Sequence, residues 1–213
     1  MRIGIDFDNT LAGYDRLFQE LAFEQGLVED STAHSKKEIR DLIWQRPKGQ
    51  TEWIRLQGLV YGTHMDRAEM IDGAADFLIC CRKRGIPVQI ISHKTEFGPL
   101  GSDPVNLRDA ARHWMETLGF FDADGFGLKP ENVFFEVSRA DKIMCIKATG
   151  CTHFVDDLEE VLTDPAFPVN VQRYLLAGSE TPLPVGPFTA HANWHEIARD
   201  LLAAEAAERE ATA

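Results

Sequence analysis

Two carboxylates, Asp6 and Asp8, stand one residue apart, directly after a short apolar run. Residues i and i+2 of an extended chain point to the same side, so both carboxylates can flank one reacting atom. One acid can then attack as a nucleophile while the other donates a proton. The pair therefore indicates covalent catalysis, and a carboxylate that attacks a phosphate monoester forms an aspartyl-phosphate.

Polar side chains also stand at the ends of two later apolar runs. They are Ser92, His93, Lys94, Asp156 and Asp157. Ligands of an open parallel sheet bind at the carboxyl ends of its strands. If the apolar runs are neighbouring strands, we expect these side chains to converge with the first acid pair on a single point.

Such a convergence of acids requires a cation, because two unit charges 4 Å apart repel by about 4 kcal/mol at an effective dielectric constant near 20. The candidate ligands are all hard oxygens, and no histidine or cysteine pattern favours zinc. The expected ion is therefore Mg²⁺. The candidate metal ligands are Asp6, Asp8, Asp156 and Asp157.

An anionic nucleophile that attacks an anionic substrate also needs a lysine to offset the charge. The candidates are Lys129, Lys142 and Lys147, which all precede Asp156. We favour Lys142, because it lies near the start of a predicted helix and so close to the strand edge. Lys129, which precedes a proline, remains the alternative.

The apolar runs alternate with helical patterns over most of the chain. Strands are predicted at 2–5, 87–92, 132–137, 152–157 and 171–176, and helices at 72–85, 106–119, 138–150 and 193–210. Continuous apolar runs are typical of strands that are buried on both faces. The expected fold class is therefore α/β, with a central parallel sheet and helices on both faces.

One segment breaks this alternation. Residues 14–70 show helical patterns without a strand, with helices predicted at 15–26, 35–46 and 50–62. We interpret 14–70 as a helical insert, and 1–13 together with 71–213 as the core. The aromatic and basic residues of the insert either recognise a leaving group or form its core and surface. These residues are Trp44, Arg46, Lys48, Trp53 and Arg55.

The overall composition limits the partners. The chain has 213 residues and a net charge of −12, which disfavours nucleic acid as the main partner. No stretch approaches the roughly 18 apolar residues of a membrane span, and the N-terminus lacks a leader pattern. The four cysteines form no Cys-x-x-Cys pair. We therefore expect a cytoplasmic protein with a small phosphorylated metabolite as its partner; the oligomeric state is not readable.

The motifs "IGIDFDNT", a strand ending in Ser92, the downstream lysine and "HFVDD" occur in one order. In that order they resemble the four motifs of the haloacid dehalogenase (HAD) superfamily of phosphohydrolases. The resemblance covers residues 2 to about 160. It implies a HAD-like Rossmannoid core, and the helical insert resembles the C1-type cap of that family.

The resemblance also implies roles for individual residues. Asp6 would be the nucleophile and Asp8 the general acid and base, with its backbone carbonyl touching the metal. Dehalogenases of the family lack this second acid, so Asp8 favours phosphoryl chemistry. Lys142 would stabilise negative charge, and the two adjacent acids Asp156 and Asp157 would bind Mg²⁺. The residues expected to bind substrate are Thr10, Ser92, His93 and Lys94.

The resulting hypothesis is a Mg²⁺-dependent phosphatase that acts on a sugar phosphate or a nucleoside monophosphate. The spacing of 14 positions from Lys142 to Asp156 is similar to that of the 5′(3′)-deoxyribonucleotidase branch. Two alternatives stay open. One is a non-catalytic module that binds a phosphorylated ligand, which would have no need of Asp8. The other is a phosphotransferase whose acceptor is not water.

Overall fold

The computed structural model describes residues 1–29, 35–98, 105–178 and 181–212. Its contacts divide the chain into two compact units. The first unit contains Met1–Leu11, Met70–His93 and Gly119–Ala213, and the second contains Ala12–Glu69 and Lys94–Leu118. Each unit is thus assembled from segments that are distant in the sequence.

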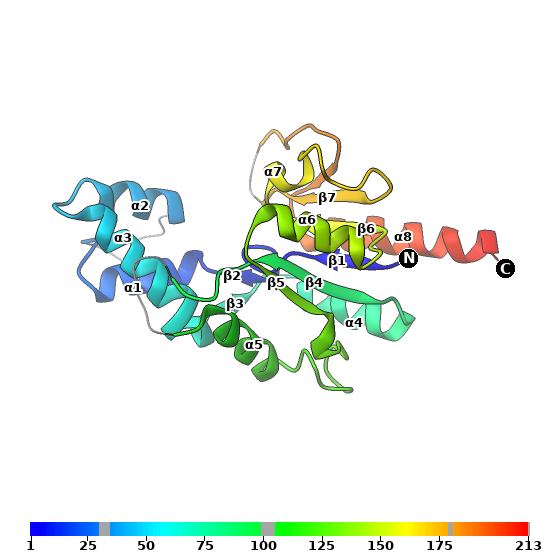
Figure 1. Cartoon of the computed structure of the whole chain (residues 1–213), viewed down its shortest axis with the longest axis horizontal. Helices are drawn as coiled ribbons and strands as arrows, with labels where there is room; N and C mark the ends of the chain where they lie inside the picture. The colour runs from blue at the N-terminus through cyan, green and yellow to red at the C-terminus, as the bar shows by residue number, and fades with distance from the viewer. Residues whose placement is uncertain (30–34, 99–104, 179–180, 213) are drawn as a thin grey trace. The chain divides into compact units, whose positions relative to one another are not determined.

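The first unit is built on a six-stranded sheet of order β5-β4-β1-β6-β7-β8, in which every neighbouring pair is parallel (Figure 1). The strands are β1 (Ile3–Ile5), β4 (Val88–His93), β5 (Val133–Glu136), β6 (His153–Asp156), β7 (Gln172–Leu176) and β8 (Thr189–His191). The parallel sheet expected from the apolar runs is therefore confirmed, and β1 lies between β4 and β6.

Helices cover both faces of this sheet. They are α4 (Ala74–Arg84), the 3₁₀ helix η4 (Pro130–Asn132), α6 (Arg139–Ala148), α7 (Glu159–Leu162) and α8 (Trp194–Thr212). The elements α6 and α7 lie on one face, whereas α4 and α8 pack together on the other (Figure 1). This double cover explains why the strands are apolar without alternation, as in β1, whose residues are all buried.

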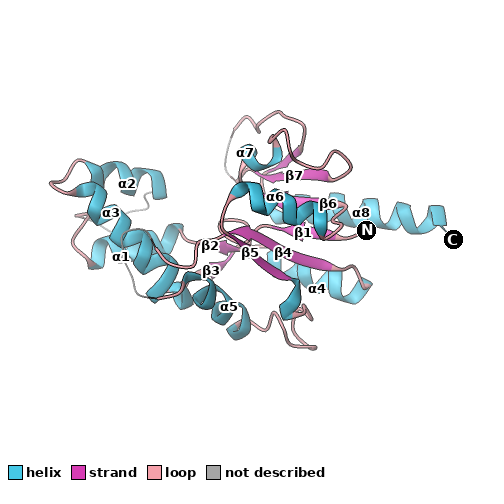
Figure 2. Cartoon of the chain, in the orientation of Figure 1, coloured by secondary structure: helices cyan, strands magenta, loops and turns pink. Residues whose placement is uncertain are grey.

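The second unit is helical. Its helices are α1 (Asp15–Glu24), α2 (Lys36–Trp44), α3 (Gly49–Gly58), the π-helix η1 (Leu59–Thr63), the 3₁₀ helix η2 (Met65–Arg67) and α5 (Leu107–Thr117) (Figure 2). Helix α2 begins at a capping box, in which Ser35 accepts from the amide of Glu38 and the Glu38 carboxylate accepts from the amide of Ser35. The helices predicted within 14–70 are therefore present.

The division of the chain differs from the predicted one at residues 94–118, which the sequence pattern assigned to the core. Contacts group this segment with the second unit. One reason is that the buried Trp114 of α5 donates its indole N–H to the carbonyl of Ala68, 2.8 Å away. A pairing of this kind has no periodic signature in the sequence.

Three short strands had not been predicted from the sequence. The strands β2 (Ala12–Gly13) and β3 (Glu69–Met70) pair with each other, and β8 lies at the edge of the large sheet. The strands β2 and β3 have two residues each and are too short to show alternation. The three residues of β8, Thr-Ala-His, lack the continuous apolar run that marks β1. Among the described residues, no helix has the length and apolar character needed to cross a membrane.

Candidate active site

A cavity of about 270 Å³ opens in the first unit where β1, β4 and β6 end. The residues predicted from the sequence that line it are Asp6, Asp8, Ser92, His93, Lys142 and Asp157. All of them lie at the carboxyl edge of the parallel sheet or on α6, as the position of a ligand site in such sheets requires. The structure therefore brings six predicted site residues to one cavity.

The register of the sheet explains why these residues meet. Ile5 of β1 pairs with Val155 of β6 on one side and with Ile90 of β4 on the other. The chain continues this alignment, because the amide of Asp6 donates to the Val155 carbonyl at 2.9 Å. The next residues of all three strands consequently reach the same edge.

The ammonium group of Lys142 lies between two carboxylates. Its Nζ donates to Oδ1 of Asp6 at 2.5 Å and to Oδ2 of Asp156 at 2.6 Å. Ser138 starts α6 by accepting a hydrogen bond from the amide of Asp141, so Lys142 falls in the first turn. Because the Lys142 side chain is only 2% exposed, its charge is shielded from water and acts strongly on these two acids.

Three acids form a cluster that could hold a cation. Asp6, Asp156 and Asp157 each offer one carboxylate oxygen, and these oxygens lie within 4.8 Å of one another. With all three acids ionised, their charges and that of the Lys142 ammonium leave two negative charges, which a divalent cation would balance. Hard oxygen donors in this number suit Mg²⁺. The side chain of Asp8 does not belong to the cluster, and its expected contribution to the metal is its backbone carbonyl.

The crowding of these acids shifts their proton affinities. Burial raises the pKa of Asp156 to about 7, because the nearby Lys142 offsets the loss of water only in part. Burial and the charges of Asp6 and Asp156 raise the pKa of Asp157 to about 8. For Lys142, burial alone would lower the pKa, but the two carboxylates it contacts raise it above its usual value. The lysine is therefore charged at neutral pH.

Thr10 lies among the acids, although it was expected to bind substrate. Its hydroxyl is 3.3 Å from Oδ1 of Asp157 and 3.5 Å from Oδ2 of Asp6. Both distances exceed the 2.7–2.8 Å of a strong hydroxyl hydrogen bond. The hydroxyl therefore sits between the two carboxylates instead of being bound tightly to either one.

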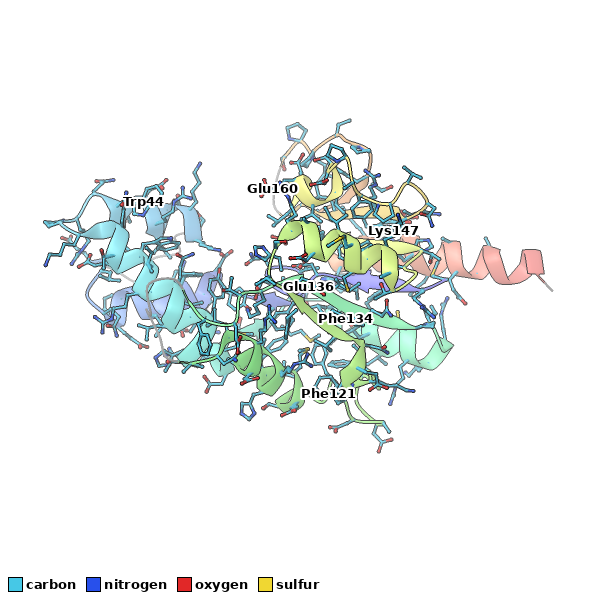
Figure 3. The ribbon with its side chains drawn as sticks, viewed as in Figure 1. Trp44, Phe121, Phe134, Glu136, Lys147 and Glu160 are labelled. Atoms are coloured by element: carbon cyan, nitrogen blue, oxygen red, sulfur yellow. The ribbon has the colours of Figure 1, made fainter. Side chains whose placement is uncertain are left out.

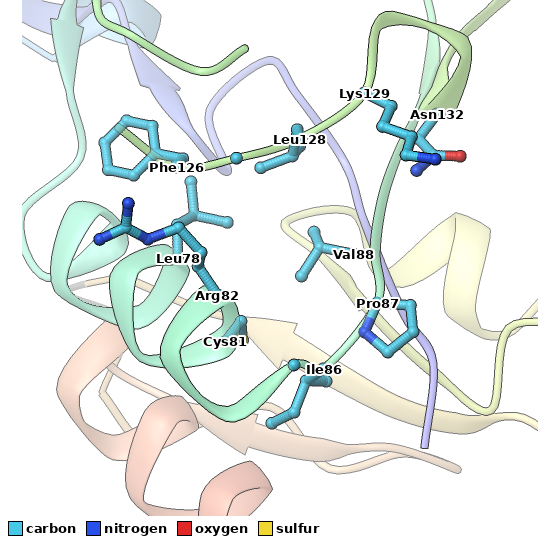
Figure 4. A pocket seen from close by; sticks show the side chains of 12 residues that line it. Leu78, Cys81, Arg82, Ile86, Pro87, Val88, Phe126, Leu128, Lys129 and Asn132 are labelled. Carbon is cyan, nitrogen blue, oxygen red and sulfur yellow. The ribbon is translucent and has the colours of Figure 1, made fainter. Parts of the chain in front are cut away.

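Geometry separates the three candidate lysines. Lys142 contacts Asp6, whereas Lys147 lies farther along α6 and is exposed (Figure 3). Lys129 lines a different cavity together with Val88, which begins β4 (Figure 4). That cavity is consequently at the amino edge of the strands, and none of the clustered acids lines it.

The remaining predicted residues belong to other surroundings. Lys94 is part of the second unit, where its Nζ lies 5.3 Å from the ring centroid of Tyr61. Trp53 is 7% exposed and stacks on Phe18, so it belongs to the core of that unit. Trp44 is half exposed, and the guanidinium carbon of Arg40 lies 4.8 Å from its ring centroid. The aromatic residues of the insert thus divide between core and surface.

Some residues at the site were missed from the sequence. Asn9, Arg139 and Glu160 line the same cavity as the predicted acids. Asn9 has a φ of 56°, a left-handed conformation that asparagine adopts more readily than most residues. Its place directly after the acid pair is a usable signal. Arg139 and Glu160 carry no such signal, because each reads as an ordinary charge in the first turn of a helix.

Neither a family model nor a curated protein matches the chain. Solved structures do. A HAD family hydrolase from Deinococcus radiodurans, described with bound phosphate and sodium, is 15% identical over 92% of each chain, with a TM-score of 0.54. Protein Tyrosine Kinase A of Mycobacterium tuberculosis is 16% identical over 93% of this chain and 96% of its own, with a TM-score of 0.60.

An L-2-haloacid dehalogenase is also similar, at 12% identity over 94% of this chain and 98% of that one, with a TM-score of 0.51. At such identities the likeness is one of fold. The parallel sheet, its strand order and these neighbours agree with the expectation from the motifs. The chain therefore has the HAD-like α/β fold.

Proposed function

We propose that this protein is a Mg²⁺-dependent phosphatase that hydrolyses a small phosphate monoester through an aspartyl-phosphate intermediate. One observation carries the proposal: the buried Lys142 ammonium lines the cavity together with Asp6, Asp8 and Ser92, and it contacts the carboxylates of both Asp6 and Asp156. A buried ion cluster of this kind costs stability, so chemistry is a better reason for it than packing.

In the first step, a carboxylate oxygen of Asp6 attacks phosphorus, and the bond from phosphorus to the ester oxygen breaks. Its electron pair leaves with that oxygen, which takes a proton from Asp8. Lys142 and the Ser92 hydroxyl offset negative charge on the phosphoryl oxygens. The alcohol departs, and the phosphoryl group stays on Asp6.

In the second step, Asp8 takes a proton from water, whose oxygen attacks phosphorus. The bond between phosphorus and Asp6 breaks, which releases inorganic phosphate and restores the carboxylate. Asp6, Asp156 and Asp157 would hold the Mg²⁺ ion, and the ion supplies positive charge that lowers repulsion between the attacking acid and the substrate.

We further propose that the helical second unit acts as a C1-type cap that selects the leaving group. The cavity of about 270 Å³ lies just below the roughly 300–1,000 Å³ of typical ligand pockets, which suits a small phosphate ester. Sugar phosphates and nucleoside monophosphates, including deoxyribonucleotides, are the substrate classes that we propose. The cytoplasm remains the predicted location.

The test is hydrolysis of a panel of phosphate monoesters, with and without Mg²⁺, by the wild type and by Asp6→Asn. The variant keeps the size of the side chain and removes its nucleophilic charge, so we expect at least a 10³-fold loss of kcat, on the order of that for removed catalytic groups. Asp76→Asn in the exposed first turn of α4 is the control. Equal rates for the wild type and Asp6→Asn on every ester would refute the proposal.

Two neighbours define the competing reactions. The same fold occurs in an L-2-haloacid dehalogenase and in a protein tyrosine kinase. The panel should therefore include 2-haloacids, with halide release as the readout. It should also include an acceptor alcohol, because a phosphotransferase would form a new phosphate ester more readily than free phosphate. Asp8, which protonates an oxygen leaving group, is the reason to expect phosphate release.

A further inference from the structure

The C-terminal helix begins with a tryptophan that reaches the catalytic loop. Trp194 is the first residue of α8 and is fully buried. Its indole Nε1 donates to the backbone carbonyl of Thr10 at 2.7 Å, across 184 positions of sequence. Helix α8 lies beside α4 on one face of the sheet (Figure 1). A distant part of the chain thus contacts the loop that follows Asp6 and Asp8.

Helix α4 and Gly73, the residue directly before α4, hold the Trp194 side chain in place. The ring centroids of Phe77 and Trp194 are 5.0 Å apart. A Cβ atom on Gly73 would lie 3.0 Å from the Cβ of Trp194, so the glycine leaves room for this approach, and its φ of +83° suits glycine. The N–H group of Trp194 is therefore directed by packing on more than one side.

The carbonyl that receives this bond belongs to the residue whose side chain lies among the acids. The Thr10 hydroxyl is 3.3 Å from Asp157 and 3.5 Å from Asp6. The loop is closed by a bond from the Leu11 amide to the Phe7 carbonyl. Rotation of the Thr10 peptide would move its Cα–Cβ bond, and with it the hydroxyl.

We propose that Trp194 is a positioning residue: it fixes the Thr10 peptide so that the Thr10 hydroxyl stays between the carboxylates of Asp6 and Asp157. The expected effect on kcat rests on the proposed function. The expected effect on the position of the Thr10 hydroxyl rests on the hydrogen bonds alone. Outer hydrogen-bond partners of this kind typically contribute 10–100-fold to activity. Nothing at the sequence level links the two residues.

The chain offers a matched control. Trp114 is also buried, and its indole donates to the backbone carbonyl of Ala68 at 2.8 Å, within the second unit. Trp194→Phe and Trp114→Phe each keep an aromatic ring and remove one buried indole N–H. A purely structural role predicts the same outcome for both variants. Positioning predicts a loss of about 10–100-fold in kcat, larger than any change in KM, for Trp194→Phe alone.

A double-mutant cycle tests whether Trp194 acts through Thr10. Thr10→Val keeps the shape of the side chain and removes its hydroxyl. If the indole serves to place that hydroxyl, then Trp194→Phe should reduce kcat much less in the Thr10→Val background than in the wild type. If the losses in kcat from Trp194→Phe and Thr10→Val were independent and simply multiplied in the double variant, the proposal that Trp194 acts through Thr10 would be overturned.

A second readout does not depend on activity. Hydrogen–deuterium exchange of the Leu11 amide should be faster in Trp194→Phe than in the wild type, and unchanged in Trp114→Phe. If no ester is hydrolysed by the wild type, the proposed function fails, and exchange alone decides the inference. If the wild type is active and both tryptophan variants match it in kcat and in exchange, the inference fails and the proposed function stands.

Discussion

In the first unit the buried ammonium of Lys142 contacts the carboxylates of Asp6 and Asp156, whereas in the second unit the buried ring of Phe18 contacts the rings of Trp53 and Tyr61. Taking a charge out of water costs several kcal/mol, and an ion pair repays this only with good geometry. Burying aromatic rings is favourable in itself. Packing therefore explains the Phe18 cluster, while the Lys142 cluster requires another reason, which we take to be catalysis.

The strongest test of this contrast is Lys142→Met, which keeps an unbranched apolar stem and removes the charge. We expect kcat to fall by about 10²–10³-fold, as for a lost electrostatic stabiliser. We also expect stability to fall by about 3–5 kcal/mol, because buried carboxylates lose their partner. Kinetics on an active ester and urea unfolding measure the two effects.

The control for this prediction is Lys147→Met on the same helix, where the lysine is exposed. It changes the net charge equally but should alter stability by no more than about 0.5 kcal/mol and leave kcat unchanged. If the two variants behaved alike, net charge and not the buried cluster would account for the effect, and the contrast between the units would be lost.

The second unit is tested by Phe18→Ala. Phe18 is fully buried on α1, so its loss should cost about 3–5 kcal/mol through lost contacts and a cavity. Phe23→Ala is the matched control, because Phe23 lies on the same helix and is 49% exposed. Urea unfolding followed by circular dichroism gives both values. A loss below about 1 kcal/mol for Phe18→Ala would mean that the aromatic cluster does not hold this unit together.

The sequence predicted the elements that carry strong periodic patterns. The five predicted strands and the principal helices are present because buried parallel strands are continuous apolar runs and amphipathic helices repeat every 3.6 residues. The acids were found by position, since Asp6 and Asp156 each close such a run. The carboxyl ends of parallel strands lie at one edge of the sheet, so local patterns were sufficient to infer that the distant acids form a cluster.

What the sequence could not show is contact without a pattern. Trp194 and Thr10 are 184 positions apart and are joined by one indole hydrogen bond. Trp114 places α5 with the second unit through a similar bond to Ala68. Single hydrogen bonds of this kind depend on three-dimensional packing, and neither the residue type nor the sequence spacing predicts them.

A smaller effect on stability is expected in β1, where close packing next to the ion cluster can be tested. Gly4 is the middle residue of β1, and a Cβ atom there would lie 2.6 Å from Cδ2 of Phe154 and 2.8 Å from Sγ of Cys151. Gly4→Ala should therefore destabilise the protein by about 1–3 kcal/mol through overpacking. Adding Phe154→Leu should restore part of this loss in a thermal melt. If Gly4→Ala left the stability unchanged, Phe154 and Cys151 would have to move aside at no cost, and the overpacking argument would fail.

The smallest expected effect comes from surface charges of the second unit. Arg67 lies 2.9 Å from Glu20 and 2.9 Å from Glu24, and all three side chains are a third to a half exposed. Hydrogen bonds from Arg16 and Arg67 lower the pKa of Glu20, and Arg67 lowers that of Glu24. Solvent and salt screen such pairs, so Arg67→Met should lower Tm by no more than about 2 °C.

The pH dependence of this small loss has a definite sign. The folded-state pKa of each glutamate is depressed, so the stabilisation is present above the unfolded-state pKa and disappears as pH falls through the folded-state pKa. The difference in Tm between the wild type and Arg67→Met should therefore shrink toward acidic pH and in high salt. Arg55→Met, an exposed arginine on α3, is the control for net charge. A large loss of Tm for Arg67→Met at low salt that disappears in high salt would show that ionic contacts, and not aromatic packing alone, hold the second unit together.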